Sequence, residues 1–274
     1  MLAQFTGVLG VSLVVAWGSV GGLLVFWRWR EQDRFEPALL KDLAGPMTLL
    51  LLALGLGQWA LSQPLGERRG VLKIALVQPA IPQTVLWNVN DPVSQSNRFE
   101  HMMNLSDRAV GKEPDLLVWP EASLPPFWVL NPTNVIRRMG QLEQALAEQG
   151  VWRVWGADTA TNNVPYNSAV LVPPEDSFLD GLKEMKWLNY AKRHLVMFGE
   201  YVPFSEQLPF LKKLAPVGNF GRGGGEVVFD MGKAKTSVII CFEDVVPKLA
   251  RRAATPEVDF LLNLTNDGWF GDSH

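Results

Sequence analysis

Two long stretches of this chain contain no charged side chain, and they limit the possible folds more than any other feature. Residues 1–27 and 43–66 carry no Asp, Glu, Lys or Arg. An apolar helix of about 20 residues crosses the hydrocarbon core of a bilayer, which is about 30 Å thick. A secretory signal is the alternative for the first stretch, but no basic residue precedes it and the apolar run is too long. The sequence therefore predicts that residues 1–66 contain two transmembrane helices, at about 5–27 and 43–65.

The segment between these stretches carries basic residues. Arg28, Arg30, Arg34 and Lys41 lie in it, whereas the first residues of the chain have no positive charge. Basic residues concentrate in cytoplasmic loops. We therefore expect a short cytoplasmic loop here, with the rest of the chain beginning outside the cytoplasm. Three basic residues just after the second stretch weaken this bias.

From residue 71 onward the pattern becomes that of an α/β domain. Apolar spacing at helical period predicts helices at about 97–111 and 133–149. Several expected strands follow one another directly, which favours a sheet with mixed strand directions. Short apolar runs predict these strands at residues 73–78, 115–119, 151–156, 168–172, 184–190, 237–241 and 259–263.

Composition and motifs exclude several kinds of function. The chain has 25 Lys and Arg against 28 Asp and Glu, so it lacks the basic field typical of a nucleic-acid partner. His101, His194 and His274 have no metal-ligand spacing, so we expect no metal site. Common signatures for phosphate, dinucleotide or serine-based chemistry are missing, and we expect no cofactor. The glycines at 221 and 223–225 are typical of a flexible hinge rather than a phosphate loop.

The single cysteine, Cys241, ends an apolar run at a predicted turn from strand to helix. Such a turn exposes its residue at a sheet edge, near helix-terminal N–H groups that lower a thiol pKa and bind an oxyanion. A buried structural cysteine is the alternative. Two other strand ends deliver Glu121 and Lys192. If the three groups meet, Glu121 can take the thiol proton, Lys192 can stabilise an oxyanion, and Cys241 can attack an acyl carbon.

Five segments, in this order, carry a specific resemblance: VQPAIPQTVLWN, VWPEASLP, KRHLVMFGEYVPF, ICFED and NLTNDGWFGDS. Together they resemble the carbon–nitrogen hydrolase (nitrilase) superfamily and, within it, the membrane-embedded apolipoprotein N-acyltransferase branch. The resemblance covers residues 71–274 and implies an α/β fold, a four-layer αββα sandwich. It implies Glu121 as general base, Lys192 as oxyanion partner and Cys241 as nucleophile. It also places four supporting residues near the site, namely Trp87, Glu200, Phe242 and Glu243.

The same resemblance implies a reaction. Cys241 would accept a fatty acyl group from a membrane phospholipid as a thioester, then pass it to the N-terminal α-amino group of a diacylglyceryl-cysteine apolipoprotein. The implied location is the bacterial inner membrane, with the catalytic domain on the periplasmic side. Residues 204–225 interleave apolar side chains, such as Phe210 and Leu211, with lysines. This pattern predicts either an arm that enters the membrane interface or a lid on the domain.

Two other functions remain compatible with these residues. A membrane-tethered amidase acting on a small C–N substrate would use the same Glu, Lys and Cys, and a non-catalytic binding module would keep the fold alone. The family pattern includes further spans before Met1 and further helix and strand after His274. The resemblance therefore predicts that this chain is a fragment whose sandwich is incomplete at its C-terminal end.

Overall fold

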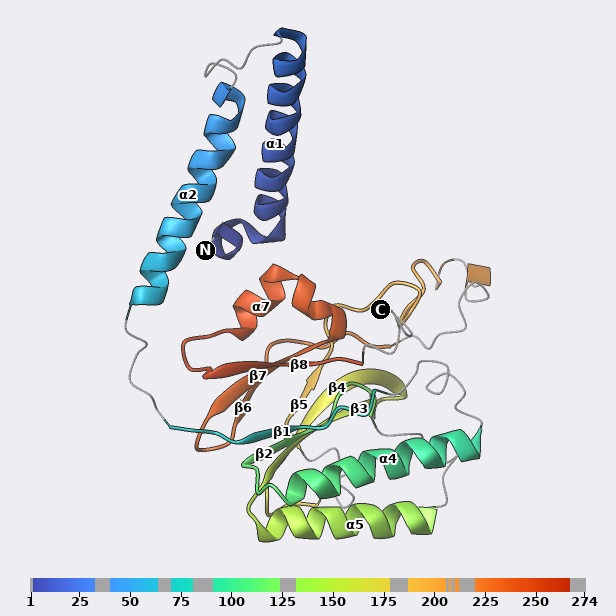
Figure 1. Ribbon diagram of the computed structural model, residues 1–274. Helices are drawn as coiled ribbons and strands as arrows, with labels where there is room; N and C mark the ends of the chain where they lie inside the picture. The colour runs from blue at the N-terminus through green and yellow to red at the C-terminus, as the bar shows by residue number, and fades with distance from the viewer. Residues whose placement is uncertain are drawn as a thin grey trace. The chain divides into compact units, whose positions relative to one another are not determined.

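The computed structural model describes residues 2–32, 40–63, 70–80, 91–123, 132–177, 187–205, 207, 210–211 and 220–266. Its internal contacts divide the chain into two units, Met1–Arg69 and Gly70–His274. Figure 1 shows a pair of helices in the first unit and sheets with covering helices in the second.

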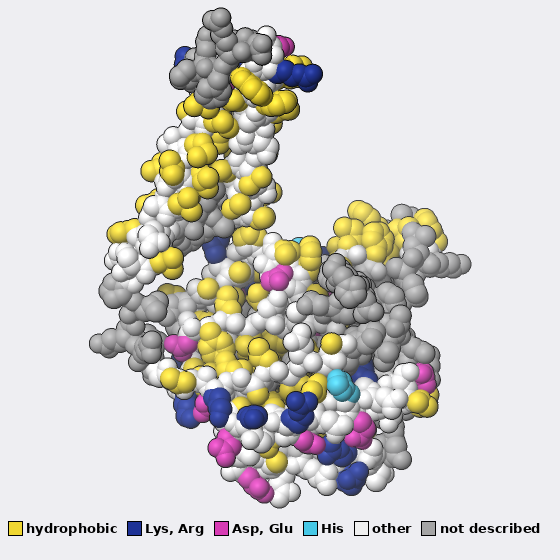
Figure 2. Space-filling view, in the orientation of Figure 1, with side chains coloured by type: hydrophobic (Ala, Val, Ile, Leu, Met, Phe, Trp, Pro, Cys, Tyr) yellow, Lys and Arg dark blue, Asp and Glu magenta, His cyan; other side chains and the backbone are white. Residues whose placement is uncertain are grey.

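The first unit consists of helices α1 (Leu2–Gln32) and α2 (Lys41–Ser62). Gly7, with φ of 66°, interrupts the helical geometry of α1. The segments Thr6–Glu31 and Lys41–Ser62 are each long and apolar enough to cross a membrane. Figure 2 shows apolar side chains along the visible surface of both helices. Their apolar surface is therefore left exposed, as in a helix surrounded by lipid.

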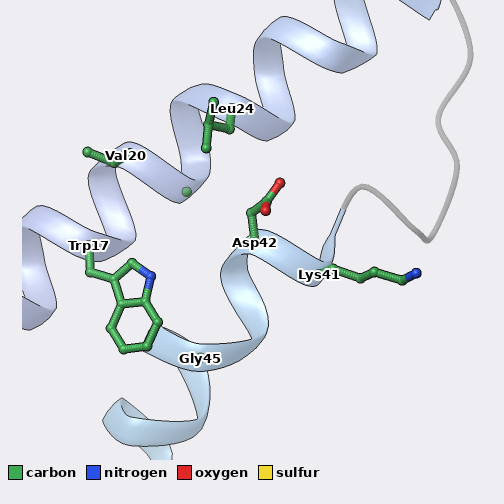
Figure 3. A pocket seen from close by; sticks show the side chains of 7 residues that line it. Trp17, Val20, Leu24, Lys41, Asp42 and Gly45 are labelled. Carbon is green, nitrogen blue, oxygen red and sulfur yellow. The ribbon is translucent and has the colours of Figure 1, made fainter.

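Close packing between α1 and α2 depends on glycines. A Cβ on Gly45 would overlap the indole of Trp17, which lies beside it in Figure 3, and a Cβ on Gly21 would meet the main chain of Asp42. Asp42 also forms an ion pair with Arg28. A cavity of about 250 Å³ lies between the helices, lined by Trp17, Val20, Gly21, Leu24, Lys41, Asp42 and Gly45. None of the site residues predicted from the sequence lines it.

The first sheet of the second unit has strand order β1-β2-β3-β4-β5. Strands β1, β2 and β3 are parallel, whereas β4 runs antiparallel to both β3 and β5. The predicted mixture of strand directions is therefore confirmed. Asn162 and Asn163 both have positive φ and form the tight turn between β3 and β4. The five strands are Ile74–Leu76, Leu116–Val118, Trp152–Thr161, Val164–Val172 and Asn189–Ala191.

Helices α4 (Pro92–Val110) and α5 (Pro132–Glu148) cover one face of this sheet (Figure 1). Helix α4 begins five residues before the predicted start, because the Asp91 side chain accepts a hydrogen bond from the Val93 amide at 3.1 Å and Pro92 occupies the first turn. The strands alternate in what they face. In β2 and just after it, Leu117 and Trp119 pack toward the helices, whereas Leu116 and Val118 pack toward the second sheet.

The second sheet has strand order β6-β7-β8, formed by Val228–Asp230, Lys235–Ile240 and Phe260–Leu264. Strand β7 is antiparallel to β6 and parallel to β8. The short strand β6 was not predicted, because three residues are too few to show a period of two. Helix α7 (Pro247–Ala253) covers the outer side of this sheet (Figure 1). The layers follow the order helix, sheet, sheet, helix, so the predicted αββα sandwich is confirmed.

Candidate active site

Three strand ends carry the residues that the sequence singled out. Glu121 lies three positions after β2, and Lys192 directly follows β5, both in the first sheet. Cys241 directly follows β7 in the second sheet. The Cys241 thiol lies near both the Glu121 carboxylate and the Lys192 ammonium, and both charges act on its pKa. The structure therefore brings the three groups together between the two sheets.

Lys192 lies at the centre of a buried ionic cluster. Its Nζ donates to Oε1 of Glu121 at 3.1 Å and to Oε1 of Glu200 at 2.9 Å, and its side chain is 1% exposed. Burial lowers the pKa of Lys192, but the two carboxylates raise it more, so this pKa lies above its usual value. An ammonium group has three donors. Two of them bind these carboxylates, which leaves one for another acceptor.

Asn167 on β4 completes the cluster, and sequence reasoning missed it. Its Nδ2 donates to Oε1 of Glu121 at 2.7 Å and to Oε1 of Glu200 at 2.8 Å. The same two carboxylate oxygens therefore accept from both Lys192 and Asn167. A signal was present in the sequence, because Asn167 is two positions before Ala169 and so shares the face of β4 that packs between the sheets. A polar amide at such a position needs partners when buried.

Glu200 is fixed by its own loop. Its Oε2 accepts a hydrogen bond from the Val196 amide at 2.9 Å, and its amide donates to the Val196 carbonyl at 2.8 Å. The Phe198 amide donates to the Tyr201 carbonyl at 2.8 Å, with Phe198 in the left-handed region at φ of 62°. This tight turn directs the Glu200 carboxylate inward, where it meets Lys192.

Glu121 sits on a turn that several contacts stabilise. Ala122, the next residue, has φ of 47°, which is uncommon outside glycine. Its carbonyl accepts a hydrogen bond from the guanidinium of Arg98, a buried residue of α4. The Ser123 amide donates to the Gly156 carbonyl at 2.9 Å, and a Cβ on Gly156 would overlap the main chain just before Glu121. Arg98 is a second residue that sequence reasoning missed.

The environment of Cys241 corrects one expectation. The thiol was expected to have a lowered pKa near helix-terminal N–H groups. Instead, burial raises the pKa of Cys241 to about 11, and the Glu121 carboxylate adds to this, whereas Lys192 and a hydrogen bond with Thr265 oppose it. The thiol begins a short 3-10 helix, η3 (Cys241–Val245), and helix α7 then starts at Pro247, so a helix follows the strand as predicted. The thiol is therefore protonated at neutral pH and needs a base to react.

Cys241 also has an uncommon backbone conformation. Its φ of 52° lies in the left-handed region, at the point where β7 ends and η3 begins. Such a conformation costs about 1–3 kcal/mol in a residue other than glycine, and the surrounding structure must stabilise it. The side chain is half-buried, so the sulfur is neither sealed in the core nor fully open.

Glu243 connects the Cys241 side of the site to the Lys192 side. It is fully buried, and its Oε2 accepts from the Tyr190 hydroxyl at 2.7 Å and from the Ile240 amide at 2.9 Å. Its Oε1 accepts from the amides of Arg193 at 2.7 Å and His194 at 2.9 Å. These bonds join the end of β5 in one sheet to the end of β7 in the other. The predicted supporting acid therefore acts on the backbone around the cluster, rather than as a member of it.

Of the two aromatic residues predicted near the site, Phe242 and Trp87, the structure describes only Phe242. Phe242 is 52% exposed, and its ring lies 6.3 Å from that of His194. Trp87 lies outside the described residues. Met197 and Phe198 are also more than half exposed, so apolar side chains flank both Lys192 and Cys241 in the chain. Among the described residues, no group of three or more His, Cys, Asp or Glu is arranged to bind a metal ion.

The hinge predicted from the glycines at 221 and 223–225 is wrong at two of the four positions. A Cβ on Gly221 would overlap the ring of Tyr166, and one on Gly223 would overlap the carbonyl oxygen of Ala191. These glycines allow close approach to neighbouring chain segments. Gly224 and Gly225 have open space around them.

This architecture agrees with the comparison to known families. Residues 73–274 match the carbon-nitrogen hydrolase family, and the chain belongs to it. It is 34% identical over 277 residues to an apolipoprotein N-acyltransferase of Geobacter metallireducens, covering 99% of this chain and 50% of the relative. An enzyme of the same name from Bdellovibrio bacteriovorus is 31% identical over 290 residues, covering 98% and 50%.

The chain thus spans about half the length of the curated relatives it matches. Among solved structures, it is similar to an amidase from Nesterenkonia sp., with 21% identity, a TM-score of 0.45 and coverage of 74% of this chain and 68% of that one.

Proposed function

We propose that this chain carries the catalytic centre of an apolipoprotein N-acyltransferase, which uses Cys241 to move a fatty acyl group from a phospholipid to an amine. The observation that supports this most is the half-buried thiol beside Glu121 and Lys192, with Glu200 and Asn167 behind them. Together, a thiol, a carboxylate and an ammonium supply a nucleophile, a general base and an oxyanion partner for thioester chemistry.

In the first step, Glu121 takes the proton of the Cys241 thiol while the sulfur attacks the ester carbonyl carbon of the phospholipid. Oε1 of Glu121 is occupied by Lys192 and Asn167, whereas Oε2 accepts no N–H or O–H donor among the described residues. Oε2 is therefore the oxygen for the thiol proton. The third N–H of Lys192 stabilises the oxyanion. The C–O bond then breaks, and the protonated Glu121 gives its proton to the departing lysophospholipid oxygen.

In the second step, a neutral α-amino group attacks the thioester carbon. The new C–N bond forms, the C–S bond breaks, and the Cys241 sulfur leaves as a thiolate. Glu121 accepts the extra proton of the amine and returns it to the sulfur, which restores the starting state. A thioester suits both steps, because the thiolate is a good nucleophile and a good leaving group.

A lipid substrate is supported by the exposed apolar side chains of the chain. Phe198 and Phe242 are each 52% exposed, Phe204 is 71% exposed and Phe210 is 61% exposed. Phe242 directly follows Cys241 and Phe198 lies two positions before Glu200, and exposed apolar side chains of this kind favour contact with acyl chains or the membrane interface. The two apolar helices support placement in a membrane. The basic loop between them favours the cytoplasmic side for that loop, and so the periplasmic side for the catalytic domain. The names of the bacterial relatives support the inner membrane and a lipid-modified apolipoprotein as acceptor.

Acyl capture by Cys241 tests this proposal. The full-length protein in phospholipid vesicles should gain the mass of one acyl group on the peptide that contains Cys241. Addition of a peptide with a diacylglyceryl cysteine at its N-terminus should remove that mass and produce an amide. Cys241→Ser should lose thioester formation and acyl transfer.

Other outcomes would point to the other functions. An acyl adduct that persists in Cys241→Ala would contradict the proposal. Release of free acid with no dependence on the amine acceptor would indicate an amidase. A thiol that forms no adduct with any acyl donor would indicate a binding module.

A further inference from the structure

We infer that residues 220–223, here called the glycine strap, hold the catalytic ammonium in place, and that Gly223 is a positioning residue for Lys192. This inference rests on the proposed function for the meaning of the cluster, but its geometry is independent of the reaction. The strap is part of the glycine-rich segment that was predicted to be a flexible hinge.

Main-chain hydrogen bonds connect the strap to two members of the cluster. The Gly223 amide donates to the Lys192 carbonyl at 3.0 Å, and the Phe220 amide donates to the Glu200 carbonyl at 3.0 Å. Between them, the Gly221 amide donates to the Pro165 carbonyl at 2.7 Å. One short segment is therefore bonded to the backbone of both Lys192 and Glu200, as well as to β4.

The fit at Gly223 leaves no room for a side chain. A Cβ there would overlap the carbonyl oxygen of Ala191, the residue before Lys192. That carbonyl cannot move aside freely, because Ala191 belongs to β5 and is paired with Ser168 of β4. By contrast, nothing lies within 4 Å of a Cβ built on Gly224. An added methyl group would therefore clash at Gly223 but not at the adjacent Gly224.

A second contact attaches the strap beside Glu200. The guanidinium of Arg222 lies over the ring of Tyr201, 5.4 Å from its centroid. A cation above an aromatic face is attracted by the ring electrons. The strap is thus bonded on one side to Lys192 and on the other to the residues around Glu200. A shift of the strap would move the ammonium relative to both carboxylates, which lie only 3.1 and 2.9 Å from it.

The reactivity of the Cys241 thiol should reveal such a shift of the ammonium. The charged groups that act on it are the Glu121 carboxylate, which raises its pKa together with burial, and the Lys192 ammonium, which lowers it along with the hydrogen bond from Thr265. Withdrawal of the ammonium should therefore decrease the thiolate fraction. Each pKa unit changes the thiolate fraction about tenfold at a pH well below the pKa.

The experiment compares Gly223→Ala with Gly224→Ala in the full-length protein. Alkylation of Cys241 by iodoacetamide is measured at about pH 8, where only the thiolate reacts. Gly223→Ala should slow alkylation about three- to tenfold and lower kcat for acyl transfer at least as much, with a smaller change in KM. Gly224→Ala should match the wild type. Equal alkylation rates in Gly223→Ala and the wild type would overturn the inference.

Two further variants separate positioning from general loss of stability. Leu146→Ala empties part of the core between α5 and the first sheet, so it should lower Tm without changing the alkylation rate. If Leu146→Ala slows alkylation as much as Gly223→Ala does, the effect is structural and the inference fails. If Gly223→Ala does not fold, Arg222→Ala tests the same strap without a clash, and an unchanged alkylation rate there overturns the inference.

Alkylation needs neither lipid nor acceptor. The wild-type protein could form no acyl thioester while Gly223→Ala still slows alkylation. That result would support the inference about the strap and contradict only the proposed function.

Discussion

The side-chain amide of Asn167 donates a hydrogen bond of 2.7 Å to Oε1 of Glu121. With this oxygen already bonded to Lys192, the other oxygen of Glu121 has no N–H or O–H partner among the described residues. In the proposed mechanism, this contact leaves Oε2 of Glu121 as the oxygen that takes the thiol proton.

Replacing Asn167 with Asp should slow acylation of Cys241 by about ten- to a hundredfold, since a hydrogen bond to a charged group contributes about 1.5–3 kcal/mol. The new carboxylate would face two others, so the acidic limb of the pH–rate profile should move to higher pH. Single-turnover acylation across pH measures both effects. Asn189→Asp is the matched control, because within the described part of the chain the Asn189 side chain makes a single hydrogen bond, to the main-chain carbonyl of Trp187 at 3.4 Å. An unshifted acidic limb in Asn167→Asp would contradict this assignment.

Glu121→Gln should separate thiol reactivity from catalysis. Because the Glu121 carboxylate raises the pKa of Cys241, its removal should lower that pKa and speed alkylation by a small reagent. Acylation by phospholipid should nevertheless fall by about 10²–10⁴, the usual contribution of a general base. Parallel measurement of the two rates checks the prediction, and a fall in both would mean that Glu121 acts on the thiol in some other way.

Lys192→Met should change alkylation in the opposite direction. The Lys192 ammonium lowers the pKa of Cys241, so its loss should slow alkylation. Acylation should also fall by about 10²–10³, as for removal of an oxyanion donor. Lys233→Met is the control, since Lys233 pairs with Asp115 through a side chain that is 74% exposed. The same alkylation rate in Lys192→Met and the wild type would contradict the geometry described for the cluster.

Arg98→Met should disturb the position of Glu121, although Arg98 bonds to the next residue and not to Glu121 itself. The substitution leaves the Ala122 carbonyl without its guanidinium donor, a loss of about 1–3 kcal/mol that falls on the turn carrying the base. We expect acylation to decrease by about tenfold or more, with partial recovery in Arg98→Lys. Arg138→Met removes another arginine, which pairs with Asp107 and Glu100 at the surface, and should leave the acylation rate unchanged. Equal rates in Arg98→Met and Arg138→Met would show that Arg98 does not position the base.

Changing Phe210 and Leu211 together to Ser tests the membrane arm. Phe210 is 61% exposed, and burial of such a side chain in an interface gains about 1.5–3 kcal/mol. The double variant should acylate more slowly from vesicles, while alkylation of Cys241 by a water-soluble reagent stays near the wild-type rate. A similar loss in both rates would instead identify the segment as a lid that shapes the site.

The sequence alone determined the elements and the residues that chemistry could use. Charge-free stretches identified the two apolar helices, because a span needs length and the absence of charge, both of which are local properties. Apolar runs identified most strands, and their ends pointed to Glu121, Lys192 and Cys241. Segment order then indicated the family, which the match to residues 73–274 confirms.

The tertiary structure alone decided how these residues act on one another. Asn167, Arg98 and Gly223 contact segments that are distant in the sequence. A local pattern, such as the place of Asn167 on a buried strand face, does not identify those partners. The same reason explains the errors at Cys241 and at the glycines. The pKa of a thiol depends on burial and on charges from other strands. A glycine in an open loop and a glycine packed against a carbonyl look alike in the sequence, because the carbonyl comes from a segment that only the fold brings close.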